Sequence, residues 1–269
     1  MVIQKILRIV FLVVLVSLTS TTKAQILNVN KHDVTTDSAN YWMGWLNFFF
    51  QIDNRSPTPN EEASLLALES SLDIIYVSER NAHFLSGQLN HYQATGDPVI
   101  STGFAHYRIN FDRKKDLSIE LYVQCSFDYS RFLDLRALGG GGLKYRLINS
   151  DVVELDIGSG VLYEHEKWGN LADDGTYTVN KMTKSSNYVK SNIGLSDHVN
   201  LAFIAFYQFG YDRDIKQVRQ RISSQLQLAF TISKHFGFIV EGAIYYENKP
   251  VIPINKTIYS FQNGLRYQF

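Results

Sequence analysis

Apolar and polar residues alternate with a period of two along most of the chain beyond about residue 40. The clearest segment runs from Leu117 to Tyr129, where every second residue is apolar and polar residues such as Glu120 and Gln124 stand between them. The side chains of a β-strand point alternately to its two faces, so this pattern predicts a strand with one apolar and one polar face. Its length exceeds the roughly five or six residues of a typical strand and suits a tilted strand that crosses a membrane.

Similar alternation recurs along the rest of the chain and predicts about twelve strands. The expected strands cover residues 41–52, 65–77, 82–94, 99–111, 117–129, 133–147, 153–164, 187–195, 199–209, 219–232, 236–247 and 257–269. Links after even-numbered strands look tight, whereas links after odd-numbered strands are generally longer, the longest being the polar segment 166–186. An even strand number with short turns on one side is typical of bacterial barrels whose termini face the periplasm.

Alternation alone does not decide whether the apolar face points inward, as in a soluble domain, or outward to lipid. The polar faces carry charges of both signs in mid-strand, which favours an enclosed, charge-lined lumen. The residues expected to line it are His106, Arg108, Glu120, Arg136, Arg146, Glu154, Asp156 and Arg221. Aromatic residues gather near strand ends, as membrane girdles do: Tyr41, Trp42, Tyr76, Tyr163, Trp168, Tyr211 and Tyr267. We therefore predict an all-β fold, a transmembrane antiparallel up-and-down barrel; a soluble secreted β-domain, purified without detergent, is the rival.

The N-terminus has the pattern of a secretory signal peptide. Lys5 and Arg8 precede an apolar run over residues 9–18, and Ala24 is a small residue suited to cleavage. The run is shorter than the about 20 apolar residues of a spanning helix, which disfavours an uncleaved anchor. The expected organisation is a signal peptide over 1–24, a periplasmic N-terminal segment over 25–40 and an outer-membrane barrel over 41–269.

The C-terminus and the charge balance indicate the partners. The last expected strand alternates aromatic and polar residues and ends on Phe269, which looks like the signal read by bacterial barrel-assembly machinery. The 26 basic and 26 acidic residues give no net charge, which argues against a nucleic-acid partner. We expect outer-membrane lipids and the assembly machinery as partners, and any solute stays unidentified.

Candidate chemistry is sparse. The single cysteine, Cys125, cannot form an internal disulfide, and the histidines show no metal-ligand spacing, so neither metal nor cofactor is expected. Ser159 and His165 share a face of one strand, but six residues at about 3.3 Å each place them about 20 Å apart. A cross-strand pair such as His83 with Ser101 stays open, and it keeps a lipid hydrolase as an alternative.

Two glycine-containing stretches carry a family resemblance. Residues 139–147 read GGGGLKYRL, and residues 160–168, after a strand that contains a glutamate, read GVLYEHEKW. They resemble the YdiY-like outer-membrane family, described as a domain of unknown function and in some members as a salt-induced outer-membrane protein. The likeness covers about residues 40–269. It implies a barrel in the outer membrane and carries no catalytic residues.

From these features we expect an integral outer-membrane barrel of a Gram-negative-type bacterium. The expected role is that of an envelope component with a charge-lined lumen and no catalytic chemistry. A channel for small solutes is the first alternative, because about twelve strands lie between tight eight-stranded barrels and wide porins. An outer-membrane lipid hydrolase is the second.

Overall fold

The computed structural model describes residues 38–54, 64–93, 98–170 and 175–269. The expected signal peptide and nearly all of the expected periplasmic segment lie outside these ranges. Within them the chain forms twelve strands and one short 3-10 helix, η1 (Tyr129–Arg131). The strands are β1 (Tyr41–Asn54), β2 (Ser64–Val77), β3 (Ala82–Gln93), β4 (Pro98–Phe111), β5 (Leu117–Asp128), β6 (Leu133–Asn149), β7 (Val153–Gly169), β8 (Tyr177–Ser196), β9 (Val199–Asp212), β10 (Gln217–Thr231), β11 (Phe236–Glu247) and β12 (Thr257–Gln268).

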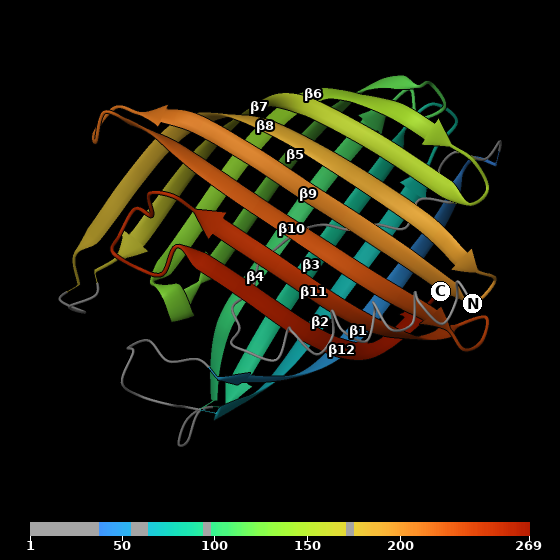
Figure 1. Cartoon of the computed structure of the whole chain (residues 1–269), viewed down its shortest axis with the longest axis horizontal. Coiled ribbons are helices and arrows are strands. Elements are labelled where there is room, and N and C mark those ends of the chain that lie inside the picture. Colours follow the sequence, from blue (N-terminus) through green and yellow to red (C-terminus); the bar gives the residue numbers. More distant parts are fainter. Residues whose placement is uncertain (1–37, 55–63, 94–97, 171–174) are drawn as a thin grey trace, which may run out of the picture.

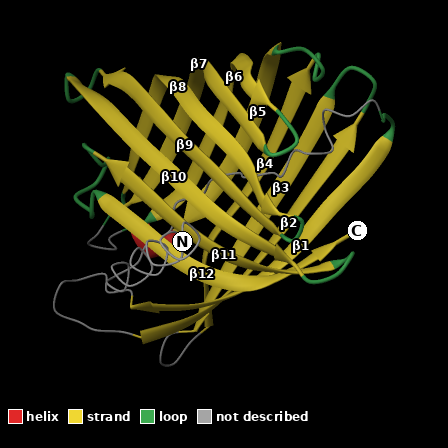
Figure 2. Cartoon of the chain, turned by 45° about the vertical axis from the view of Figure 1, so that its right-hand side comes forward, coloured by secondary structure: helices red, strands yellow, loops and turns green. Residues whose placement is uncertain are grey.

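Every strand pairs antiparallel with its neighbours in the sequence, and β12 returns to pair with β1 (Figures 1 and 2). The sheet is therefore a closed up-and-down barrel, which confirms the predicted fold. At the seam, the backbone N–H groups of Gly44 and Phe269 donate to each other's carbonyl oxygens at 3.1 and 3.0 Å. The start of β1 and the end of β12 share one end, the turn end, with the links after even-numbered strands. The links after odd-numbered strands lie at the other, the loop end.

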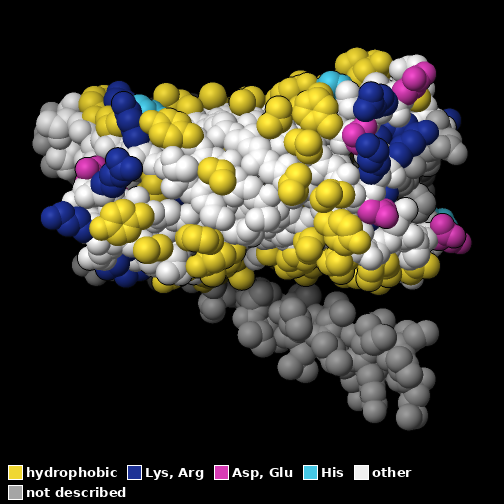
Figure 3. Space-filling view, turned by 90° about the horizontal axis from the view of Figure 1, so that it is seen from above, with side chains coloured by type: hydrophobic (Ala, Val, Ile, Leu, Met, Phe, Trp, Pro, Cys, Tyr) yellow, Lys and Arg dark blue, Asp and Glu magenta, His cyan; other side chains and the backbone are white. Residues whose placement is uncertain are grey.

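The apolar faces of the strands point outward. On β5, Leu121 and Val123 are 49% and 56% exposed, whereas Glu120 and Ser118 are 5% and 2% exposed. On the face shown in Figure 3, hydrophobic side chains are spread over the wall and charged ones gather near the two ends. A soluble domain would bury the apolar face instead, so the burial pattern contradicts that rival and fits a wall facing lipid. No helix in the described ranges has the length and apolarity to cross a membrane.

The segment expected to be the longest loop is mostly strand. β7 continues to Gly169 and β8 begins at Tyr177, so the prediction of a loop over 166–186 was wrong. Much of this hairpin carries polar residues on both faces, and the contrast between faces that marks a strand in the sequence is lost there.

Two aromatic residues expected in the membrane girdle lie inside instead. Trp168 is 2% exposed, and its indole N–H donates to Glu166 at 3.3 Å. It shares strand parity with Glu164 and Glu166, which face inward. Tyr41 is half-buried and packs against an apolar cluster inside the barrel. Trp42, on the opposite face of β1, is 69% exposed as a girdle residue would be.

The interior near the turn end is filled by apolar and charged groups. The apolar cluster contains Met43, Trp45, Ile75, Val77, Ala82 and Phe84. Arg113, in the β4–β5 turn, is fully buried and donates from Nε to the Ser78 carbonyl and from Nη2 to the Ser38 carbonyl, both at 2.8 Å. Beside it, hydrogen bonds from Lys115 and then Arg80 hold the pKa of the Asp112 carboxyl below its usual range.

Candidate functional site

Six charged side chains from five strands meet inside the barrel toward its loop end. We name them the central cluster: Arg136 of β6, Glu164 and Glu166 of β7, Lys184 of β8, Arg221 of β10 and Glu247 of β11. Three cations contact Glu164: Arg136 at 2.5 Å, Arg221 at 2.7 Å, and Lys184. Arg221 also donates to Glu166 at 2.9 Å and to Glu247 at 3.3 Å.

The central cluster is electrically balanced and largely buried. It joins three cations to three carboxylates, and even its most exposed side chain, Arg136, is only 15% exposed. A buried charge is tolerated when a partner and hydrogen bonds compensate its lost hydration, and each member has such a partner. Because β8 and β9 separate β7 from β10 in the ring, the pair of Arg221 and Glu164 spans part of the interior. The cluster thus ties distant parts of the wall together and occupies the lumen.

A second polar group lies on β4, β5 and β8. We name Arg108, Glu120, Tyr122 and Tyr188 the Arg108 group. Arg108 is 3.7 Å from Glu120 and lies over the rings of Tyr122 and Tyr188, 5.6 and 5.8 Å from their centroids. The Tyr188 hydroxyl donates to Glu120 at 2.7 Å. The guanidinium is thus held by a carboxylate and by two aromatic faces.

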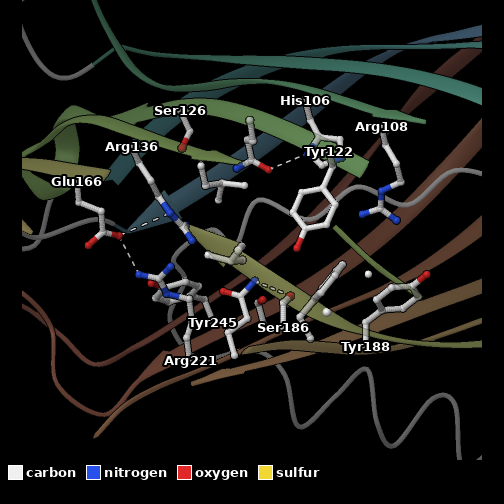
Figure 4. Close-up of a pocket in the computed structure, with 18 of the residues that line it drawn as sticks. His106, Arg108, Tyr122, Ser126, Arg136, Glu166, Ser186, Tyr188, Arg221 and Tyr245 are labelled. Atoms are coloured by element: carbon white, nitrogen blue, oxygen red, sulfur yellow. Dashed lines mark hydrogen bonds and ion pairs between the residues drawn. The ribbon is translucent and has the colours of Figure 1, made fainter. Parts of the chain in front are cut away.

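A cavity of about 110 Å³ separates the central cluster from the Arg108 group (Figure 4). One buried water needs roughly 10–15 Å³ by this measure, so the cavity has room for several waters or a small solute. No side chain projects into the cavity where Gly142 of β6 lies opposite Gly160 of β7, and both glycines line the cavity. A Cβ on Gly142 would stand 2.7 Å from the Gly160 Cα, which leaves no place for a side chain.

The connection between β11 and β12, residues 248–256, crosses the mouth at the loop end. We name it the strap. Its Ile252 is 7% exposed and packs against Leu133 and Trp168, with Phe132, Val251 and Ile254 around this contact. The ring places β5 and β6 opposite β11 and β12, so the strap reaches the far wall only by spanning the mouth. Leu133 and Trp168 also line the cavity, which therefore lies directly beneath the strap.

The structure places the eight residues expected to line the lumen in two regions of the interior. His106, Arg108, Glu120, Arg136 and Arg221 line the cavity. Arg146, Glu154 and Asp156 lie nearer the turn end, where Arg146 donates to the Arg113 carbonyl at 2.9 Å and Glu154 accepts from Asn192 at 3.4 Å. Asp156 is 2% exposed and stands opposite Arg146 in the register of β6 and β7.

Of the central cluster, only Arg136 and Arg221 were among the residues expected from the sequence to line the lumen, and the strap was not expected. Glu166 and Lys184 fell in the segment expected to be a loop, and Glu247 stood at the margin of its strand. The strap did carry a signal, because Val251, Ile252 and Ile254 are apolar residues within a connection. Apolar residues in a link require a surface to pack on, and that surface is the far wall.

The hydrolase pairs considered from the sequence do not form. The Ser159 hydroxyl donates to Asn187 Oδ1 at 2.7 Å. His83 lies opposite Ile109, eight residues along β4 from Ser101, and its Nδ1 is 2.8 Å from the Tyr107 hydroxyl. Each histidine therefore lies several residues along the strands from the serine considered with it.

Comparisons with known proteins add a family and a fold. The sequence profile of a family described as a protein of unknown function, DUF481, matches residues 64–269. No curated protein matches the chain. The solved COG4313 outer membrane channel from Pseudomonas putida F1 is 9% identical, with a TM-score of 0.52 over 89% of this chain and 98% of its own. A NanC porin is 10% identical, with a TM-score of 0.46 over 84% of this chain and 97% of its own. At the identity of the first structure, the likeness shows a shared fold alone.

Proposed function

We propose, from the premise that this chain belongs to the DUF481 family of proteins of unknown function, that it is a non-catalytic barrel of the outer membrane. In this proposal it is an envelope component whose charge-lined lumen is closed to free diffusion at rest. The outward apolar wall supports the membrane location, and the paired interior charges support the closed lumen.

One observation carries the closed lumen: Arg221 bridges Glu164 and Glu166 on β7 and Glu247 on β11. An ion that crosses this level must displace buried charges that already neutralise one another. Parting such a pair leaves uncompensated buried charge, which is costly. The interior near the turn end adds a second obstruction, built from the apolar cluster around Trp45 and from Arg113.

Conductance across planar lipid bilayers tests the proposal. We expect the purified wild-type barrel in KCl to give no steady current. We expect Arg221→Ala combined with Trp45→Ala to give measurable current, because the bridge between the walls is gone and the filling of the turn end is weakened. Lys167→Ala is the matched control, since Lys167 pairs with Asp134 at 3.5 Å outside the cluster, where both side chains are about one-third exposed. A steady current through the wild-type barrel would contradict the closed-lumen proposal.

A channel for small solutes is the second candidate, and the cavity favours it. The cavity supplies polar and aromatic walls inside the barrel and needs only continuity to both ends to become a path. Steady wild-type current, with swelling of liposomes in small sugars, would support this candidate over the first. Incubation with phospholipid micelles tests the non-catalytic assignment, because released fatty acid would contradict it.

The cellular location has its own test. The N-terminal pattern of Lys5, Arg8 and the apolar run supports export followed by cleavage after Ala24. We expect the protein in the outer-membrane fraction with Gln25 as its first residue. Recovery in the soluble periplasm, or a retained N-terminus in the inner membrane, would contradict the location.

A further inference from the structure

The strap is attached differently at its two ends and at its middle, residues 251–255, which we name the crown. Near its ends, the Lys249 carbonyl accepts from Arg219 Nη1 at 2.5 Å, and the Lys256 carbonyl accepts from the Glu247 N–H at 2.8 Å. Asn248 adds a bond from Nδ2 to the Val218 carbonyl at 3.2 Å. These bonds fix the ends of the strap to the rims of β10 and β11.

The crown meets the far wall through apolar packing and one long hydrogen bond. Ile252 packs on Leu133 and Trp168, and Arg131 Nη2 reaches the Asn255 carbonyl at 3.4 Å, a long hydrogen bond. Apolar contact is non-directional, so the crown can leave this surface without breaking a strong bond. A segment whose ends are hydrogen-bonded and whose crown is held mainly by packing can swing about its ends.

The space beneath the crown suits a polar solute. Arg131 of η1 and Arg221 of β10 lie over the ring of Tyr245, 5.4 and 5.5 Å from its centroid, directly below the strap. Serine and glutamine side chains, such as Ser186 and Gln208, line the deeper part. Ligand pockets typically combine aromatic walls with polar groups that orient the ligand, and this cavity has both.

We propose that residues 248–256 cover the cavity as a displaceable strap, and that lifting the crown from Leu133 and Trp168 admits small polar solutes from the loop end. This inference rests on the proposed closed barrel and specifies which segment governs access to its interior. It requires access to the cavity and does not require passage through the turn end. Conductance and access can therefore give different answers.

The test measures how fast a thiol inside the cavity reacts. Ser223 lines the cavity on β10, so Ser223→Cys is placed in a Cys125→Ser background, and its modification by a small water-soluble methanethiosulfonate is followed in lipid vesicles. The strap variant replaces Val251, Ile252 and Ile254 with serine. We expect slow reaction beneath the native strap and at least tenfold faster reaction beneath the serine strap.

The control is Ile215→Ser in the β9–β10 link, an exposed apolar residue at the same end, which should leave the rate unchanged. Equal rates beneath the native and serine straps would overturn the proposal, as would rapid reaction beneath the native strap. Should the serine strap prevent folding, Pro250→Gly with Pro253→Gly keeps the three apolar side chains and loosens only the backbone; an unchanged rate there would also overturn it. Steady current through the wild-type barrel, together with a thiol reaction rate that depends on the strap, would contradict the closed lumen and support the strap proposal.

Discussion

At the scale of single residues, Glu164 is the carboxylate on which the central cluster depends. It is 2% exposed and meets Arg136, Lys184 and Arg221. Glu164→Ala leaves three buried cations with fewer partners, which typically costs about 3 kcal/mol or more. We expect a loss of that size in the free energy of unfolding, measured by urea titration of the protein in lipid vesicles.

Asp134→Ala provides the comparison. Asp134 pairs with Lys167 at 3.5 Å, and both side chains are about one-third exposed. A solvated pair of this kind contributes roughly 0–1 kcal/mol. Similar losses from the two variants would show that the central cluster is as hydrated as the rim, and the argument for a lumen closed by charges would fail.

At the scale of the strands, the sequence was informative wherever the two faces of a strand meet different surroundings. β5 was predicted almost to the residue, because Leu121 and Val123 face outward while Glu120 faces the interior. The first half of β8 was missed because its outward residues include Thr183 and Ser185. With polar residues on both faces, only pairing with β7 identifies the strand, and pairing is not visible in a local pattern.

The β4–β5 turn shows how one side chain secures an element. The hydrogen bonds that Arg113 donates to the Ser78 and Ser38 carbonyls fasten this turn to the β2–β3 turn and to the residues before β1. Hydrogen bonds from a charged donor contribute about 1.5–3 kcal/mol each. We expect Arg113→Ala to lower stability by about 3 kcal/mol, seen as earlier loss of β-sheet circular dichroism on heating.

Lys115→Ala probes the same turn from its exposed side. Lys115 bonds Asp112 at 3.0 Å with its side chain 66% exposed, so its removal should cost less than about 1 kcal/mol. An equal shift in the two melting curves would mean that the turn tolerates loss of its buried anchor. The role assigned to Arg113 would then be wrong.

At the scale of the whole molecule, the site depended on information that no local pattern carries. Arg221 and Glu164 stand 57 positions apart, and β8 and β9 separate their strands in the ring. Both lie on the polar faces of alternating strands, yet their contact depends on the relative register of four strands and on the width of the closed barrel. The strap is similar, since only the closed ring shows that Ile252 has a far wall within reach.

The outward apolar face leads to a further prediction, because the free-energy cost of a charged side chain in lipid depends on its depth in the bilayer. Leu226 and Val218 lie on the same outward face of β10, both 44% exposed, but Leu226 stands well inside the strand and Val218 near its loop end. An arginine at mid-membrane costs roughly 2–4 kcal/mol, whereas one near the interface costs roughly 0–1 kcal/mol. We therefore expect Leu226→Arg to destabilise the barrel in vesicles by several times as much as Val218→Arg, measured by guanidinium unfolding. Equal effects would mean that the outer wall of β10 does not face hydrocarbon, since water and protein surroundings impose no such gradient with depth.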